Sequence, residues 1–339
     1  MFSKILNTLK KKKVLLILLI LSVILISIVS VFVLSKKEEI VVEEKKKETE
    51  ETTFTMSTLE EDLVYTQETK DFPSWMNDNG QGPWYQDLYI AYSDNGLDFT
   101  GEKLYIPHSG VGNLILGNDE EIIATFQYFS YENQELFDKI CYTTSTDGGL
   151  TWSSIKKVNI SGLPQGPNAV DPTLVLLEDG KYRLYFTYET YGDGNPQLYS
   201  ALGESMDSEF VNEGKQLEVD SIILDPAVIY FNGMYHHYTV SHEGDEERSM
   251  TSFHSISETG LDFEEVGTFT EEIQFLGDVV LVDDGLRFYG SGMGIQSAFS
   301  TDGYTWTMDE GKRVDGADPG VVKLTDGSYV IIYTGVGAK

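Results

Sequence analysis

The chain has 339 residues, of which 41% are hydrophobic and 12% aromatic, enough apolar side chains for one large domain or two ordinary ones. This composition excludes a disordered protein. Its 24 basic and 55 acidic residues give a formal net charge of −31, which would repel nucleic-acid phosphates and anionic lipid surfaces, so nucleic-acid binding is disfavoured.

The amino-terminal end predicts a single-pass membrane anchor. Residues 14–34 are an unbroken run of 21 uncharged, almost entirely aliphatic residues, long enough as a helix to cross a hydrocarbon core of about 30 Å. Lysines are dense in the short basic segment 1–13, so the positive-inside rule puts that segment in the cytoplasm and the following chain outside. A cleaved signal peptide is the alternative, but Phe32-Val33-Leu34-Ser35 lacks the small-residue cleavage pattern.

Residues 35–72 are rich in Glu, Lys and Thr and poor in aromatic residues, which is typical of a flexible, solvated stalk. The only cysteine, Cys141, lies far beyond the apolar run. Lipid attachment at the end of that run and an intramolecular disulfide are therefore both excluded.

A β-hairpin pattern repeats through the remaining chain, residues 73–339. In its clearest form an Asp-Pro pair opens a strand, an Asp-Gly or Asn-Gly turn follows, and a second strand returns. Three clear copies and two weaker ones occur, at residues 171–188, 225–238, 318–333, 113–126 and 277–289. Such repetition predicts a repeat architecture.

A second motif, a Ser-x-x-Gly or Ser-x-Asp-Gly turn followed by an aromatic residue, occurs between the hairpins at residues 93–99, 145–152, 257–263 and 300–306. Ser and Asp side chains can accept N–H bonds across such a turn, Gly can take a positive φ, and the aromatic can fill space between layers. Each repeat is therefore predicted to be a four-stranded sheet, A to D, and radially arranged sheets of this kind form an all-β propeller.

The two ends of the repeat region predict how the ring closes. The last copy stops after strands A and B, whereas the first strands, residues 88–92 and 104–106, form a C–D hairpin without its A and B. Joining them completes five blades and leaves no open sheet edge.

In a propeller the inner A strands begin on one face, and the B strands return to it. We call this the front face. It is expected to gather Asp171, Asp225 and Asp318 from A-strand starts, together with residues from B-strand ends: Tyr188, Glu189, His242 and Glu243. Converging carboxylates beside aromatics suit glycosidic bond cleavage. The alternative is that the aspartates only start strands and that Glu189 and Glu243 are solvated loop charges.

Residues 75–84 precede a C strand and are expected over the same face. Trp75 and Trp84 flank a Gly-rich loop that contains Asp78, and indoles suit stacking on sugar rings. The alternative is that both indoles fill the joint between stalk and propeller.

The hairpins and turns resemble those of the five-bladed glycosidases of the arabinanase, levansucrase and invertase group, over about residues 75–339. The resemblance implies a glycoside hydrolase with a base or nucleophile, a pKa modulator and an acid, at positions matching Asp318, Asp171 and Asp225. The acid of the family is normally Glu, and no Glu starts an inner strand here, so Glu243 is an alternative acid.

Two further resemblances are weaker evidence for a family. Residues 75–80 are similar to the invertase box Trp-Met-Asn-Asp-Pro-Asn-Gly without its proline, but a C strand follows them instead of an A strand. Residues 145–152 are similar to a sialidase Asp-box. A sialidase needs three arginines on the substrate carboxylate, and the chain has only four, Arg183, Arg248, Arg287 and Arg313, two of which lie inside predicted B strands.

Two classes of function remain: a membrane-anchored extracytoplasmic glycoside hydrolase, and a non-catalytic propeller that binds glycans or a protein. A pair of front-face carboxylates with separated pKa values would favour the enzyme. Five histidines without ligand spacing give no metal or cofactor signal, although a propeller tunnel leaves room for a structural calcium. The expected partner is a carbohydrate, and the expected state is a monomer.

Overall fold

The computed structural model describes residues 53–55, 85–131, 133–191, 195–242, 250–269 and 275–335. The chain divides into two units, Met1–Thr53 and Phe54–Lys339, and all described residues except Thr53 belong to the second. The predicted segments 1–13 and 14–34, almost all of the stalk, and the loop of residues 75–84 lie outside the described residues. Within the described ranges, no helix is long and apolar enough to cross a membrane.

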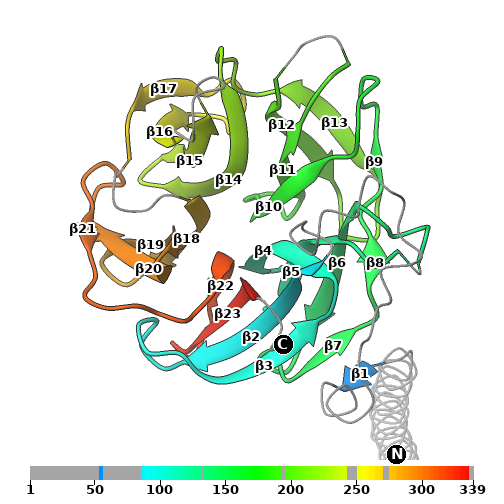
Figure 1. Ribbon diagram of the computed structural model, residues 1–339. Helices are drawn as coiled ribbons and strands as arrows, with labels where there is room; N and C mark the ends of the chain where they lie inside the picture. Colours follow the sequence, from blue (N-terminus) through cyan, green and yellow to red (C-terminus); the bar gives the residue numbers. More distant parts are fainter. Residues whose placement is uncertain are drawn as a thin grey trace, which may run out of the picture. The chain divides into compact units, whose positions relative to one another are not determined.

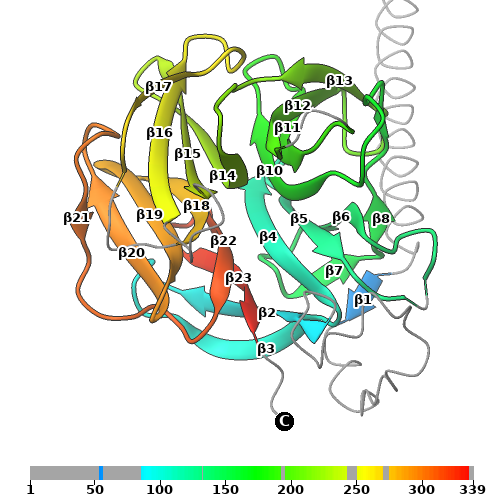
Figure 2. The same cartoon turned by 45° about the horizontal axis from the view of Figure 1, so that its top comes forward.

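Five β-sheets surround a common axis, each with one strand innermost and the others stacked outward (Figure 1, Figure 2). In ring order, and from the inside outward, they are β22 (Ala317–Lys323), β23 (Tyr329–Gly335), β2 (Asp87–Ser93) and β3 (Thr100–Ile106); β4 (Ser109–Leu116), β5 (Ile122–Tyr128), β6 (Lys139–Ser145) and β8 (Lys156–Lys157); β10 (Val170–Leu176), β11 (Tyr182–Tyr188), β12 (Gln197–Gly203), β13 (Phe210–Lys215) and β9 (Ile160–Ser161); β14 (Ile222–Phe231), β15 (Met234–His242), β16 (Met250–Ser257) and β17 (Glu264–Gly267); and β18 (Phe275–Val282), β19 (Gly285–Gly292), β20 (Gly294–Ser300) and β21 (Thr307–Met308). Two short strands, β1 (Thr53–Thr55) and β7 (Thr151–Ser153), form a separate pair.

The predicted all-β, five-bladed propeller and its mode of closure are confirmed. Strand β2 pairs antiparallel with β23 from Asp87 opposite Gly335 to Ser93 opposite Tyr329, so one blade combines strands from both ends of the repeat region. Figure 1 shows this as cyan strands β2 and β3 beside red strands β22 and β23.

One blade departs from the predicted four strands. The sheet of β10 to β13 carries β9 as a fifth strand, which runs parallel to β13 and pairs Ile160 with Phe210. The connection between two blades therefore runs along the outer edge of the second one before entering it, and it covers backbone groups that an edge strand would otherwise expose.

The turns have the predicted chemistry. Asp147 accepts the N–H groups of Leu150 and Thr151 at 3.0 and 2.9 Å, and Gly148 and Gly149 have positive φ. The aromatic that follows, Trp152, is 1% exposed, and its ring lies 4.8 Å from that of Tyr105. These turns are therefore part of the packing between sheets.

Candidate active site

A β-bulge interrupts each of the five inner strands near its start. The pairing register between inner and second strand shifts between Val170 and Thr173, and at the corresponding places in the other blades: Gly110 to Asn113, Leu224 to Ala227, Leu276 to Asp278 and Ala317 to Gly320. The three aspartates lie in these bulges, one to three residues inside their strands, and not at the first residue as the sequence suggested. Bulges commonly re-aim side chains beside active sites.

The backbone at the three aspartates is left-handed, with φ of 54° at Asp171, 49° at Asp225 and 46° at Asp318. Asp is among the few residues that adopt this conformation readily, so a purely structural role is one explanation. However, the corresponding residue in β4 is Val111, with φ of 50°. The bulge therefore forms even with a β-branched residue and does not by itself require a carboxylate.

The ring brings the three carboxylates into one electrostatic cluster. Asp171 and Asp225 lie on the neighbouring strands β10 and β14, and the Asp225 N–H donates to Asp171 Oδ2 at 3.4 Å. Asp318 lies on β22, one strand removed from each of them, and its charge still acts on Asp225. Each side chain keeps part of its surface accessible while protein surrounds the rest.

Burial and the neighbouring charges give the three carboxyl groups different pKa values. Burial, followed by the charges of Asp171 and Asp318, holds the pKa of Asp225 well above its usual range. Burial and the charge of Asp171 raise the pKa of Asp318 to about 6, with the side chains of Thr334 and Ser291 opposing the shift. Burial also raises the pKa of Asp171, which the Thr187 side chain and the Asp225 N–H partly offset. Of the three carboxyl groups, Asp225 therefore has the environment that most favours the protonated form, whereas Asp318 ionises above about pH 6.

Three polar side chains that interact with these carboxylates were not predicted: Thr187 at Asp171, and Thr334 and Ser291 at Asp318. In all five blades the second strand carries a polar residue one position before its end: Gln127, Thr187, Ser241, Ser291 and Thr334. Ser291 Oγ accepts the Asp318 N–H at 2.8 Å from the adjacent blade. The recurrence of a polar residue at this position of the second strand was a signal available in the sequence.

A second unpredicted feature is a buried carboxylate one position beyond the bulge, Asp278. Its Oδ2 accepts the Val321 N–H at 2.9 Å and the Asn113 side-chain amide at 3.1 Å, while its Oδ1 accepts the Val279 N–H at 2.8 Å. Asp278 is 3% exposed, and burial raises its pKa to about 7.

The Asp278 contacts continue around the ring through Asn113, whose Oδ1 accepts the Leu174 N–H at 2.9 Å, and through Thr173, whose hydroxyl donates to the Pro226 carbonyl. All five inner strands are thus linked by side chains at one level. This level lies just beyond the three aspartates in the direction of the strands, so it fixes the strands that carry them.

Of the other predicted site residues, three lie within the described residues: Tyr188, Glu189 and His242. Tyr188 is 3% exposed, packs against Phe186 and Tyr199, and donates its hydroxyl to the Pro164 carbonyl at 2.6 Å. Glu189 follows it and is half-buried. His242 ends β15, where its backbone pairs with Met250. Four predicted residues lie outside the described residues: Glu243, Trp75, Asp78 and Trp84.

The arginines of the described chain are engaged in structural contacts. Arg183 binds Glu213 and the Thr259 carbonyl, Arg287 binds Asp309, and Arg313 donates to the Leu97 carbonyl. A triad of arginines for a substrate carboxylate is therefore not supported among these residues. Nor do the described residues contain a group of three or more His, Cys, Asp or Glu side chains arranged to hold a metal ion.

No family model and no curated protein sequence matches the chain. Several solved structures are similar to the chain. The Hadza microbial sialidase Hz136 is 18% identical with a TM-score of 0.43, over 61% of this chain and 47% of the sialidase, so this chain spans about half of that protein. A family 117 glycoside hydrolase, Zg3597 from Zobellia galactanivorans, is 13% identical with a TM-score of 0.46, over 74% of this chain and 91% of the hydrolase.

A third structure is CoXyl43, a GH43 β-xylosidase/α-arabinofuranosidase from a compost microbial metagenome, solved in complex with xylotriose. It is 13% identical with a TM-score of 0.49, over 66% of this chain and 84% of CoXyl43. GH43- and GH117-type glycoside hydrolases are thus among the solved structures to which this chain is similar. At this identity the likeness concerns the fold alone, and the chemistry has to be argued from the aspartate cluster.

Proposed function

We propose that this protein is a glycoside hydrolase that acts on glycans outside the cell and is held at the membrane by residues 14–34. The observation that carries the enzymatic part is the cluster of three inner-strand carboxylates whose pKa values differ. Glycosidases need one carboxyl group protonated and another ionised at the same pH. A propeller that only binds glycans has no need of such a pair.

The environments suggest a role for each residue. Asp318, with a pKa of about 6, is ionised at neutral pH and suits the base or nucleophile. Asp225, whose pKa is held well above its usual range by burial and then by the charges of Asp171 and Asp318, suits the acid that protonates the leaving oxygen, with Glu243 as the alternative acid. Asp171 donates no proton in this scheme; after burial, its charge is the largest contribution that raises the pKa of Asp225, which is the role of a modulator.

The test is a screen of the full-length protein in detergent against aryl glycosides and plant and bacterial polysaccharides, in parallel with Asp318→Asn. Hydrolysis by the parent and a loss of roughly 100-fold or more in the variant would support the proposal. Equal rates in both proteins would contradict the assigned base. Glycan binding without hydrolysis of any substrate would favour the non-catalytic propeller.

The membrane part of the proposal rests on the apolar run and the lysine asymmetry at the amino terminus. Protease added to intact cells should degrade the propeller, and a cytoplasmic marker protein should survive as the control. A propeller that is degraded only after the cells are lysed would contradict this orientation.

A further inference from the structure

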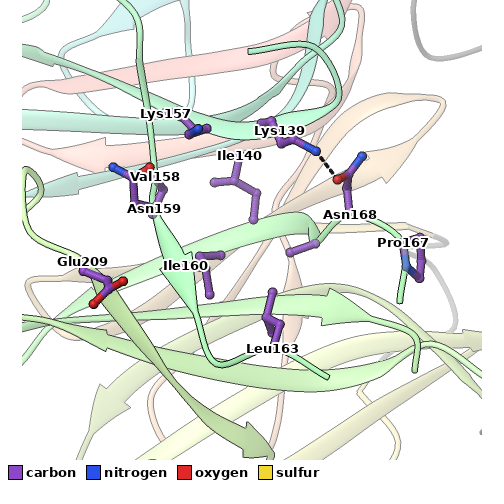
Figure 3. A pocket seen from close by; sticks show the side chains of 11 residues that line it. Lys139, Ile140, Lys157, Val158, Asn159, Ile160, Leu163, Pro167, Asn168 and Glu209 are labelled. Carbon is purple, nitrogen blue, oxygen red and sulfur yellow. Dashed lines mark hydrogen bonds between the residues drawn. The ribbon is translucent and has the colours of Figure 1, made fainter. Parts of the chain in front are cut away.

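A pocket of about 580 Å³ lies between the blade that contains β4, β5, β6 and β8 and the blade that contains β9 to β13 (Figure 3). The three aspartates are not part of its lining. Its walls come from the start of β6, the segment from β8 to β9, and the segment that leads into β10. β6 and β10 both begin on the front face, so the Lys139, Asn168 and Ala169 part of the lining lies toward the side of the proposed active site. A volume of this size is typical of small-molecule sites.

The polar lining of the pocket is cationic, in a chain whose net charge is −31. Figure 3 shows Lys139 and Lys157 on one side and Glu209 on the other. Among the ion pairs of the described residues, none involves either lysine. Two ammonium groups and one carboxylate leave a net charge of +1 in the lining.

The fold directs one of these lysines into the pocket. Successive residues of a strand face opposite sides, and β8 consists of Lys156 and Lys157. Lys156 faces outward and pairs with Asp207 at 2.9 Å, so Lys157 faces the pocket instead. Lys139 donates to the neutral Asn168 side chain, whose amide donates in turn to Asp138 at 2.5 Å. Its ammonium position is thereby fixed without neutralising its charge.

The rest of the lining suits a sugar. Ile140, Ile160 and Leu163 supply apolar surface, on which the C–H face of a pyranose can lie. Asn159 and Glu209 offer groups that can hydrogen-bond hydroxyls. A phosphate with about two negative charges would exceed the net charge of the lining and meet repulsion from Glu209, whereas a carboxylate carries a single charge.

We propose that this pocket binds a carboxylated sugar, a uronic acid residue of the glycan, through Lys139 and Lys157. Asn168 and Ala169 line the pocket, and Asn168 precedes Asp171 by three residues, a span of at most about 10 Å of extended chain. A glycan held here would therefore continue toward the aspartate cluster. This specificity rests on the proposed hydrolase function, but binding in the pocket can be measured separately.

The experiment is a ligand-observed NMR titration of the full-length protein in detergent with sodium glucuronate, glucose and glucose 6-phosphate. We expect glucuronate to bind more tightly than either of the others, and more weakly as salt is added. Lys157→Gln and Lys139→Gln should each weaken glucuronate binding roughly tenfold, because each removes one charged hydrogen bond. Lys156→Gln is the matched control and should bind as the parent does.

Several outcomes would overturn the proposal: equal affinity for glucose and glucuronate, tighter binding of glucose 6-phosphate, or an equal loss in Lys156→Gln. Thermal melting of each variant checks that the fold is retained. Glucuronate binding is measured without turnover, so a failure of catalysis leaves this test intact. If the protein hydrolyses neutral glycans and replacement of either pocket lysine leaves that rate unchanged, the pocket proposal is contradicted, whereas the proposed hydrolase function still stands.

Discussion

Asp171, Asp225 and Asp318 share one backbone conformation but differ in what surrounds their carboxylates. Replacement by Asn tests the difference, because Asn also tolerates left-handed φ and keeps one oxygen while the charge is lost. Asp318→Asn and Asp171→Asn should melt near the parent temperature and lose roughly 100-fold or more in rate. Exposed Asp94→Asn is the matched control. Parent rates in all three bulge variants would exclude the cluster as the active site.

The residue that acts as the general acid can be identified by comparing substrates with different leaving groups. If Asp225 protonates the leaving oxygen, Asp225→Asn should lose little rate on aryl glycosides with acidic leaving groups and much more on natural glycans. If Glu243 is the acid, Glu243→Gln will show this pattern instead, with Asp225→Asn slow on both substrates. Rates on the two substrate types measure the difference directly.

The same residues predict the pH profile of kcat/KM. Activity should rise as Asp318 ionises, near pH 6, and should fall again at the higher pH where Asp225 loses its proton. With an activated aryl glycoside the alkaline fall should flatten, because that leaving group needs little protonation. A profile that rises instead near pH 4, the ordinary range of an exposed carboxyl, would show that Asp318 is not the base.

At the scale of strands, Asp278 joins β18, β4 and β22 through its three hydrogen bonds. Its pKa is about 7 in the folded chain, whereas an unfolded Asp titrates near pH 3.9. Between these values the folded form keeps a proton that the unfolded form releases, so stability should fall as pH rises from about 4 to 7. The full shift corresponds to roughly 4 kcal/mol.

Urea unfolding at pH 5 and pH 8 tests this prediction. Asp278→Asn loses one acceptor, which costs on the order of 1 kcal/mol, but its side chain cannot titrate. The loss of stability between pH 5 and 8 should therefore be smaller in the variant than in the parent, and unchanged in the exposed Asp94→Asn. An equal loss in all three proteins would show that Asp278 is not the source of the pH dependence.

At the scale of the whole ring, stability depends on the pairing of β2 with β23. Removing residues 323–339 deletes β23 and leaves β2 without its partner, so two sheet edges open. Because every blade packs on its neighbours, we expect loss of cooperative unfolding for the entire propeller and not for one blade. Removing only residues 336–339 is the matched control, since β23 ends at Gly335. Cooperative melting of the longer deletion near the parent temperature would contradict this closure.

The sequence alone was sufficient to predict the number of blades and the pairing that closes the ring. Hairpins and turns are local signals, set by Gly at positive φ, by Asp and Ser beside backbone N–H groups, and by alternating apolar residues, so each copy could be recognised without its neighbours. The unmatched strands at residues 88–106 and 318–333 then left one way to complete the ring. The apolar run 14–34 is a local signal of the same kind, and its role stays a prediction.

Only the tertiary structure decided which polar residues act together. Asp171, Asp225 and Asp318 could be named as candidates, but their unequal pKa values arise from burial and from charges up to 147 positions away in the chain. Asp278 looked like an ordinary strand residue until β4 and β22 were placed on either side of it. No local pattern in the sequence singles out Lys139 and Lys157, because their common pocket is made by two blades. Such properties depend on distances between separate strands, which local patterns in a sequence do not specify.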